Sequence, residues 1–195
     1  MIKKWIWVGV IALLAALLIW VVFFWQPGSV RSAPSKGGDF TLRSATGTLS
    51  LRELRGKVVL LYFGYTLCPD ICPTSLAFTA QGLTQLDVKE LEKVRMLFIT
   101  VDPERDTLEH LKSYTMFFHP SIIGLTGTPE EIARAAGLYG ASYAKQTVES
   151  AAGYVVDHSS DTYVIAPDGS LYATLPHATQ PGKVAEQIRA ALKHP

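Results

Sequence analysis

Hydrophobic residues are distributed in two different ways along the chain. The first run, residues 5–25, contains no charged or strongly polar side chain. As a helix rising about 1.5 Å per residue it would span roughly 30 Å, the thickness of the hydrocarbon core of a bilayer. All four tryptophans lie near its two ends, as expected at membrane interfaces: Trp5, Trp7, Trp20 and Trp25. The pattern predicts an N-terminal transmembrane helix.

Two lysines, Lys3 and Lys4, precede this run, which indicates a cytoplasmic N-terminus. A cleaved signal peptide is the competing interpretation. Its apolar region would be shorter, ~7–15 residues, and would end in a small-x-small site that residues 26–31 do not offer. A helix buried in a soluble core is a second alternative. We expect a retained single-pass anchor in a bacterial inner membrane, in contact with lipid, with the rest of the chain in the periplasm.

After the anchor the pattern changes to short, alternating strand and helix signals. Residues 58–63 and 96–101 are continuous apolar runs, typical of buried central strands. Helical spacing follows at 73–86, 107–118, from Thr128 onward and at 182–193, with Thr107 and Thr128 as expected N-caps. Shorter strands are expected at 40–42, 48–51, 122–125, 153–156, 162–166 and 171–175, the last two joined by a hairpin turn at Asp168-Gly169. This alternation predicts an α/β fold with a mixed sheet flanked by helices.

The predicted organisation has three parts. Residues 1–26 form the membrane anchor. Residues 27–38, rich in Gly, Pro and Ser, form a flexible linker. Residues 39–195 form one folded domain.

Composition narrows the possible functions. The 195 residues include 18 Lys and Arg against 17 Asp and Glu. This balance excludes a broadly basic nucleic-acid-binding protein and a highly charged disordered chain. The only two cysteines, Cys68 and Cys72, can form one disulfide, one redox pair or part of one metal site.

The cysteine pair follows the predicted strand 58–63 and opens the next helix. A helix N-terminus favours the thiolate, the form that binds soft metals and attacks disulfides. An inert disulfide remains possible, although a bridge across so short a loop stabilises little. A redox dithiol and a soft-metal site are the other two interpretations.

Of the five histidines, His158 is the candidate third ligand. It precedes the strand expected at Thr162, on a connection that would lie beside the cysteine loop. The neighbouring Asp157 is a poor candidate for orienting the imidazole, because successive strand side chains point to opposite faces. Two thiolates and one imidazole suit Cu(I), or Cu(II) with an added ligand, whereas structural zinc requires four ligands. The other histidines are expected to be solvated: His110, His119, His177 and His194.

Four segments in this order resemble the SCO/SenC family: GYTLCPDICPTSL at 64–76, VDPERDT at 101–107, GLTGT at 124–128 and VDHS at 156–159. The resemblance implies a thioredoxin-like fold that binds copper through Cys68, Cys72 and His158. It also implies that copper comes from an upstream periplasmic donor and is delivered to the dinuclear copper site of cytochrome c oxidase subunit II. One departure is Leu67, where many members carry a histidine.

Two enzymatic alternatives remain. A thiol-disulfide oxidoreductase would use Cys68 and Cys72 as its redox pair. Against it stand the C-x-x-x-C spacing and the absence of a proline just before the strand at Thr162. A thiol peroxidase would require Thr or Ser where Tyr65 stands.

The charged residues of 102–106 are interpreted as turn and helix-start charges, rather than as an acidic metal cluster.

Overall fold

The computed structural model describes residues 37–148 and 153–194, together with Trp5 and Leu13 as isolated positions. Apart from Trp5 and Leu13, the predicted membrane helix at 5–25 therefore lies outside the described residues, as does most of the predicted linker. Within the described part, no helix is both long and apolar enough to cross a membrane. Backbone contacts divide the chain into two units, Met1–Ser32 and Ala33–Pro195, and the fold below is that of the second unit.

The core of the second unit is a mixed sheet of five strands in the order β5-β4-β3-β8-β9. The three parallel strands are β3 (Val58–Gly64), β4 (Val94–Thr100) and β5 (Ile122–Leu125), and the antiparallel ones are β8 (Thr162–Ile165) and β9 (Leu171–Leu175). All of β3 is buried, which explains its uninterrupted apolar run. The predicted mixed sheet and the β8–β9 hairpin are confirmed.

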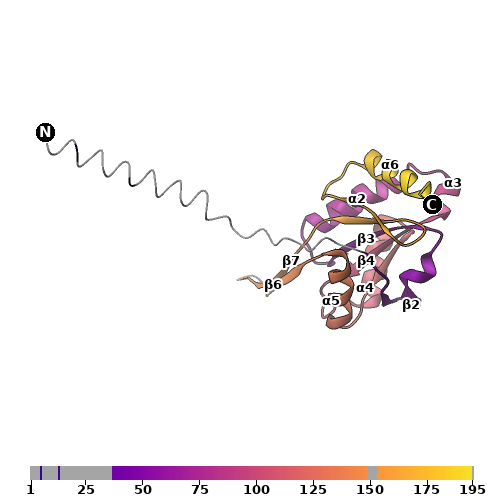
Figure 1. Cartoon of the computed structure of the whole chain (residues 1–195). Helices are drawn as coiled ribbons and strands as arrows, with labels where there is room; N and C mark the ends of the chain where they lie inside the picture. Colours follow the sequence, from indigo (N-terminus) through magenta and orange to yellow (C-terminus); the bar gives the residue numbers. More distant parts are fainter. Residues whose placement is uncertain (1–4, 6–12, 14–36, 149–152, 195) are drawn as a thin grey trace. The chain divides into compact units, whose positions relative to one another are not determined.

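Helices cover this sheet. Figure 1 shows α2 (Ile71–Leu83) and α6 (Pro181–Leu192) together on one side, and α4 (Leu108–Phe118) and α5 (Pro129–Tyr139) on the other. A Cβ at Gly82 would lie 2.8 Å from the Val184 side chain, so this glycine lets α2 and α6 approach closely. The predicted N-caps are confirmed, because Thr107 and Thr128 accept hydrogen bonds from backbone N–H groups of α4 and α5.

Four short elements complete the described part: β1 (Thr41–Ser44), β2 (Gly47–Ser50), the 3₁₀ helix η1 (Leu51–Leu54) and α3 (Val88–Glu92). A separate hairpin pairs β6 (Tyr143–Thr147) with β7 (Tyr154–His158) and projects from the body in Figure 1. Strand β6 was not predicted, because its exposed residues carry no apolar period. Helix α2 begins at Ile71, two residues before the predicted start at 73, so Cys72 lies in its first turn.

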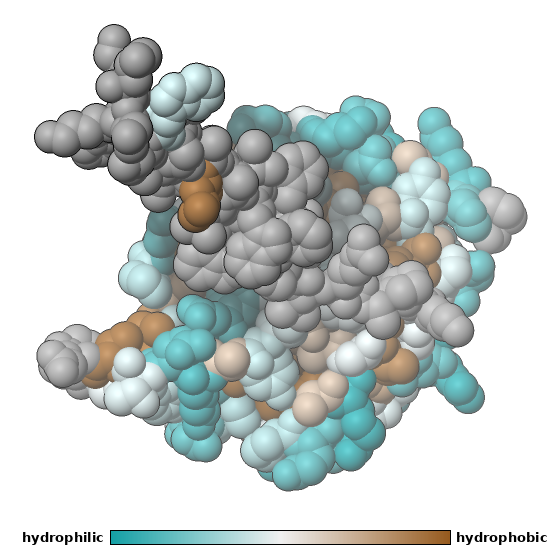
Figure 2. All heavy atoms as spheres, turned by 60° about the vertical axis from the view of Figure 1, so that its left-hand side comes forward, coloured by the Kyte–Doolittle hydropathy of each residue, from teal (hydrophilic) through white to brown (hydrophobic). Residues whose placement is uncertain are grey.

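The described part of the second unit exposes few large apolar side chains. On the face shown in Figure 2, hydrophilic side chains are spread over the described part and apolar ones are scattered among them. The exposed large apolar residues of the second unit are Leu67, Val88, Met116 and Phe117. Leu67, next to Cys68, is 54% exposed.

Candidate metal centre

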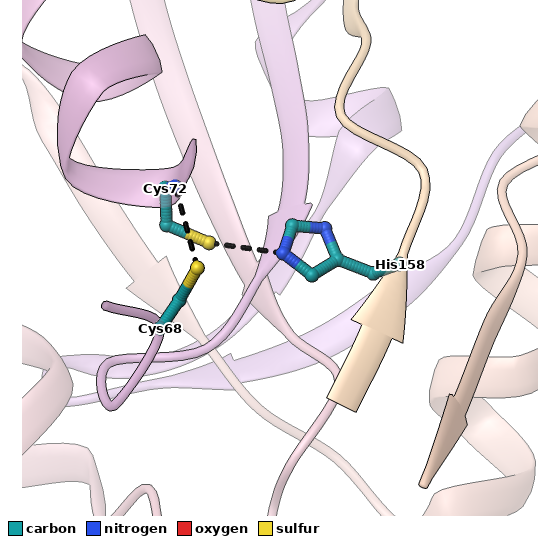
Figure 3. A group of neighbouring side chains, drawn as sticks. All are labelled: Cys68, Cys72 and His158. Carbon is teal, nitrogen blue, oxygen red and sulfur yellow. Dashed lines mark hydrogen bonds between the residues drawn. The ribbon is translucent and has the colours of Figure 1, made fainter. Parts of the chain in front are cut away.

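The cysteine pair lies where the central strand β3 gives way to α2. Cys68 belongs to the connecting loop and Cys72 to the first turn of the helix, as Figure 3 shows. The backbone N–H of Cys72 donates a hydrogen bond to Cys68 Sγ at 3.5 Å. Cys72 is fully buried and Cys68 is 8% exposed, and both are free thiols. The predicted position of the pair at a helix start is confirmed.

His158, the last residue of β7, reaches the pair from a distant part of the chain. Its Nε2 lies 3.2 Å from Cys72 Sγ, and the ring points at the sulfurs in Figure 3. Its Nδ1 lies 2.9 Å from the carbonyl oxygen of Ser159. A carbonyl only accepts hydrogen bonds, so Nδ1 donates to it, and Nε2 is the ring nitrogen that faces the sulfurs. Ser159 therefore orients the ring, and Asp157 does not, as expected.

The two sulfurs and the imidazole nitrogen lie within 4.8 Å of one another. Among the residues that the structure describes, this is the one group of Cys, His or acidic side chains able to hold a metal ion. The edges of two aromatic rings flank the imidazole, with centroid distances of 6.1 Å to Tyr62 and 5.8 Å to Tyr65. The site is thus a soft, three-donor set in a largely apolar wall, which fits copper better than zinc.

The two thiols differ in their protonation. Hydrogen bonds, the largest effect coming from the Cys72 thiol and smaller ones from His158 and the backbone, lower the pKa of Cys68 to about 4, against the opposing effect of burial. Burial raises the pKa of Cys72, and the neighbouring Cys68 raises it further. At neutral pH the metal-free pair therefore holds one thiolate, at Cys68, and one thiol, at Cys72.

A pocket of about 500 Å³ opens beside the site. Its walls come from the cysteine loop and from β7, and include Tyr65, Cys68, Ile71, Val156 and His158. Cys68 and His158 line it, whereas the more deeply buried Cys72 does not. An incoming group therefore meets Cys68 and His158 first.

Of the other four histidines, all predicted to be solvated, two are exposed and two are not. His110 and His194 are exposed, as expected. His119 was wrongly predicted to be solvated: it is 9% exposed, and its Nδ1 accepts a hydrogen bond from the Ser121 N–H at 3.0 Å. Burial lowers the pKa of His119. His177 is half-buried, with Nδ1 2.8 Å from Ser75 Oγ.

Two of the acidic residues after β4 are buried, so they are more than the solvated turn and helix-start charges that the sequence predicts. Asp102 and Asp106 are 0% and 2% exposed, although they do stand in a turn before a helix. Asp106 accepts bonds from the Thr66 N–H at 3.2 Å and from the hydroxyls of Thr66 and Thr100 at 2.5 Å each. It therefore ties the cysteine loop to the end of β4. Burial was not evident in the sequence, because the surrounding residues are polar.

Comparison with known proteins identifies the family of the chain. The SCO1/SenC family profile matches residues 28–193, which is most of the sequence. The chain belongs to the SCO1/SenC family. This confirms the resemblance given by the four sequence segments, and with it the thioredoxin-like fold.

Relatives and solved structures within the family span mitochondria and bacteria. "Protein SCO2 homolog, mitochondrial" of Bos taurus is 39% identical over 163 residues, covering 83% of this chain and 61% of the relative. An "SCO2-like protein" of Rickettsia felis is 37% identical, covering 78% of this chain and 75% of the relative. A crystal structure of yeast Sco1 with copper bound is 35% identical with a TM-score of 0.73, and covers 83% of this chain and 91% of the other. The chain spans about three fifths of the length of the mammalian SCO2 relatives.

Proposed function

We propose that this protein is a copper carrier that binds the ion through Cys68 Sγ, Cys72 Sγ and His158 Nε2. The observation that carries the proposal is the convergence of these three donors within 4.8 Å of one another, from a loop, a helix and a distant strand. The solved structure of yeast Sco1 with copper bound supports the choice of metal. The soft donor set supports it independently.

The protonation of the site suits uptake of Cu(I) or Cu(II). Cys68 is already a thiolate at neutral pH, and Nε2 of His158 faces the two sulfurs. Cys72 must lose its proton before both sulfurs can bind as thiolates, so copper binding releases that proton. Delivery then proceeds by ligand exchange from the open side, where Cys68 and His158 line the pocket.

We propose cytochrome c oxidase subunit II as the recipient and its dinuclear copper site as the destination, with an upstream periplasmic protein as donor. A solved family member is described as belonging to the cytochrome c oxidase assembly proteins. Residues 1–26 would hold the chain in the bacterial inner membrane with the domain in the periplasm. If residues 27–38 act as a random-coil linker, they would reach roughly 20 Å and raise the effective concentration of the domain near a membrane-bound recipient.

The test is copper titration of the full chain in detergent, reduced and metal-free, against a competing chelator. Three single variants remove one donor each: Cys68→Ser, Cys72→Ser and His158→Ala. His194→Ala removes an exposed histidine and serves as the matched control. Wild type and control should bind one equivalent, and each donor variant should lose roughly a hundredfold in affinity, equal to about 2.7 kcal/mol. Wild-type affinity in Cys68→Ser or His158→Ala would refute the site.

A second candidate function is reduction of the recipient's disulfide. It is favoured by the unequal thiols, since Cys68 is a thiolate and Cys72 a buried thiol. Cys68 would attack one sulfur of the substrate disulfide and release the other as a thiolate. Cys72, losing its proton, would then attack Cys68 and release the second substrate thiolate, so that two electrons leave the pair as it becomes a disulfide. This activity should survive His158→Ala, whereas copper binding should not.

A further inference from the structure

The hairpin β6–β7 carries His158 but lies outside the main sheet. Within the described residues, β6 and β7 pair only with each other. A two-stranded hairpin by itself is at most marginally stable in water. A metal donor, however, must be held within about half an ångström of its productive position. Contacts outside the β6–β7 ladder must therefore fix the hairpin.

Strand β6 contributes one such contact, the ion pair of Lys145 Nζ with Glu104 Oε2 at 2.7 Å, and further contacts lie along the outer edge of β7. Ser159 N–H donates to Ser142 C=O, and Val148 N–H donates to Gly153 C=O. In the register of this hairpin, every second residue from Gly153 to Ser159 therefore bonds to the β6 side. The backbone groups of Tyr154 and Val156 consequently face away from β6. They meet side chains instead of a strand: Arg105 Nη1 donates to the Tyr154 carbonyl at 3.1 Å, and the Val156 N–H donates to Tyr65 Oη at 3.4 Å.

Arg105, Asp102 and Tyr154 form a compact group, called here the Arg105 cluster. Arg105 Nε forms a close ion pair with Asp102 Oδ2, while Tyr154 Oη donates to Asp102 Oδ1 at 2.7 Å. The guanidinium also lies 3.7 Å from the centroid of the Tyr154 ring. Tyr154 is thus held at its carbonyl, its ring face and its hydroxyl by two side chains.

The Arg105 cluster is anchored in the body of the protein. Asp102 follows the central strand β4 and is fully buried, and its backbone N–H donates to Thr100 Oγ1 at 3.0 Å. The Arg105 side chain is 19% exposed. Charge-assisted bonds and a cation–π contact are stronger in such a poorly solvated place than at the surface. The cluster is therefore a firm connection between the main sheet and the start of β7.

We infer that the Arg105 cluster positions His158 by fixing β7 against the connection between β4 and α4. The inference rests on the proposed function of His158 as a copper ligand. Tyr154 starts the strand that His158 ends, about 13 Å along the same rigid element. Release of Tyr154 would let the hairpin pivot and carry the imidazole away from the sulfurs. Arg105 and Tyr154 are positioning residues, since neither contacts the sulfurs or the imidazole donor.

The test compares Arg105→Gln with Arg189→Gln in the full chain in detergent. Arg189 likewise makes an ion pair, with Glu90 at 2.9 Å, and donates to a backbone carbonyl, that of Gln85 at 2.7 Å, but it joins α6 to the α3 region. A third variant, Tyr154→Phe, removes the hydroxyl bond to Asp102 and keeps the ring beneath Arg105. Urea unfolding of each variant shows whether it folds and how much stability it has lost.

Two readouts separate positioning from general stabilisation. The first is amide hydrogen exchange of β6 and β7 in the metal-free protein. It should accelerate roughly tenfold or more in Arg105→Gln, as expected for loss of a charge-assisted bond, and less in Tyr154→Phe. The second readout is copper binding, measured in two ways: the nitrogen hyperfine signal of His158 in the Cu(II) form and the copper affinity. Arg105→Gln should lose most of that signal and roughly tenfold in affinity, while Arg189→Gln should retain both.

Unchanged affinity and an unchanged histidine signal in a folded Arg105→Gln protein would overturn the inference. So would unchanged hairpin exchange in that variant. If wild type itself shows no histidine nitrogen on copper, the proposed function fails instead. In that event the exchange data alone decide whether the Arg105 cluster fixes the hairpin.

Discussion

At the residue scale, the cysteine pair combines two thiols of opposite character four positions apart. Cys68, beside the pocket, receives hydrogen bonds from the Cys72 thiol, from His158 and from the backbone, and together these outweigh its burial. Cys72, behind it, is shielded from water, which raises its pKa. One charge is thus shared by two sulfurs, because a second negative charge would lie close to the first.

This asymmetry predicts the pH dependence of alkylation. The thiolate reacts, so the rate at Cys68 falls as pH drops through its pKa of about 4. In reduced, metal-free protein, the iodoacetamide rate should stay nearly constant from pH 8 to about 5, with the label found at Cys68 by mass spectrometry. Cys72→Ala removes the main hydrogen bond that lowers the pKa, so its midpoint should move toward the ordinary thiol value near 8.5. A wild-type midpoint near 8.5 would contradict this.

At the scale of elements, the loop between β3 and α2 is held by a buried carboxylate from another connection. Asp106 accepts three hydrogen bonds, two from Thr66 in that loop and one from Thr100 at the end of β4. The loop that carries Cys68 is therefore fixed from the neighbouring parallel strand. A carboxylate suits this place because all three partners donate.

Asp106→Asn tests that role. The amide keeps the shape but replaces an accepting oxygen by a donating NH₂ group, so at least one buried donor loses its partner. We expect a loss of roughly 2–3 kcal/mol in the free energy of unfolding, measured by urea denaturation. Asp157→Asn, on an exposed residue of β7, should change it by less than about 0.5 kcal/mol. Equal effects of the two substitutions would argue against the network.

Gly64, the last residue of β3, leaves space for Cys72 Sγ because it has no side chain. A Cβ at Gly64 would lie 2.7 Å from Cys72 Sγ and 2.9 Å from the Tyr62 ring. Gly64→Ala must therefore displace the sulfur or the rings around it. We expect a loss of roughly 1–3 kcal/mol in stability and weaker copper binding in the chelator competition.

Gly137→Ala is the matched control for that substitution. Gly137 lies within α5, and a Cβ there would meet nothing within 4 Å. Alanine should raise stability by about 0.5–1 kcal/mol, through its higher helix propensity, and leave copper affinity unchanged. Normal stability and normal affinity in Gly64→Ala would show that the sulfur does not need that space.

At the scale of the whole molecule, the N-terminal segment is expected to keep the copper domain at the membrane. Full-length protein should remain in the membrane fraction after alkaline carbonate extraction, with its N-terminal residues present by mass spectrometry. Residues 39–195 expressed alone should be recovered in the soluble fraction. Leu13→Lys combined with Leu17→Lys should abolish insertion, since each central lysine costs about 2.5–3.5 kcal/mol. Detection of a chain shortened near residue 26 would instead support a cleaved signal peptide.

Much of the architecture was predictable because it depends on neighbours in the sequence. The apolar runs of β3 and β4, the caps at Thr107 and Thr128 and the turn at Asp168 are local signals, and each was confirmed. The missed or mistaken features depend on packing. Strand β6 has no apolar period and exists through pairing with β7, and His119 is a polar residue that the fold buries.

The sequence by itself determined the fold class, the family and the place of two cysteines at the start of a helix, because short-range patterns specify these. Only the tertiary structure decided that His158, 86 positions after Cys72, brings its Nε2 to 3.2 Å from that sulfur. It also decided that Asp102 and Asp106 are buried and connect the loops around the site. The physical reason is that such contacts join residues far apart in the chain, and their geometry is set by the packing of whole elements.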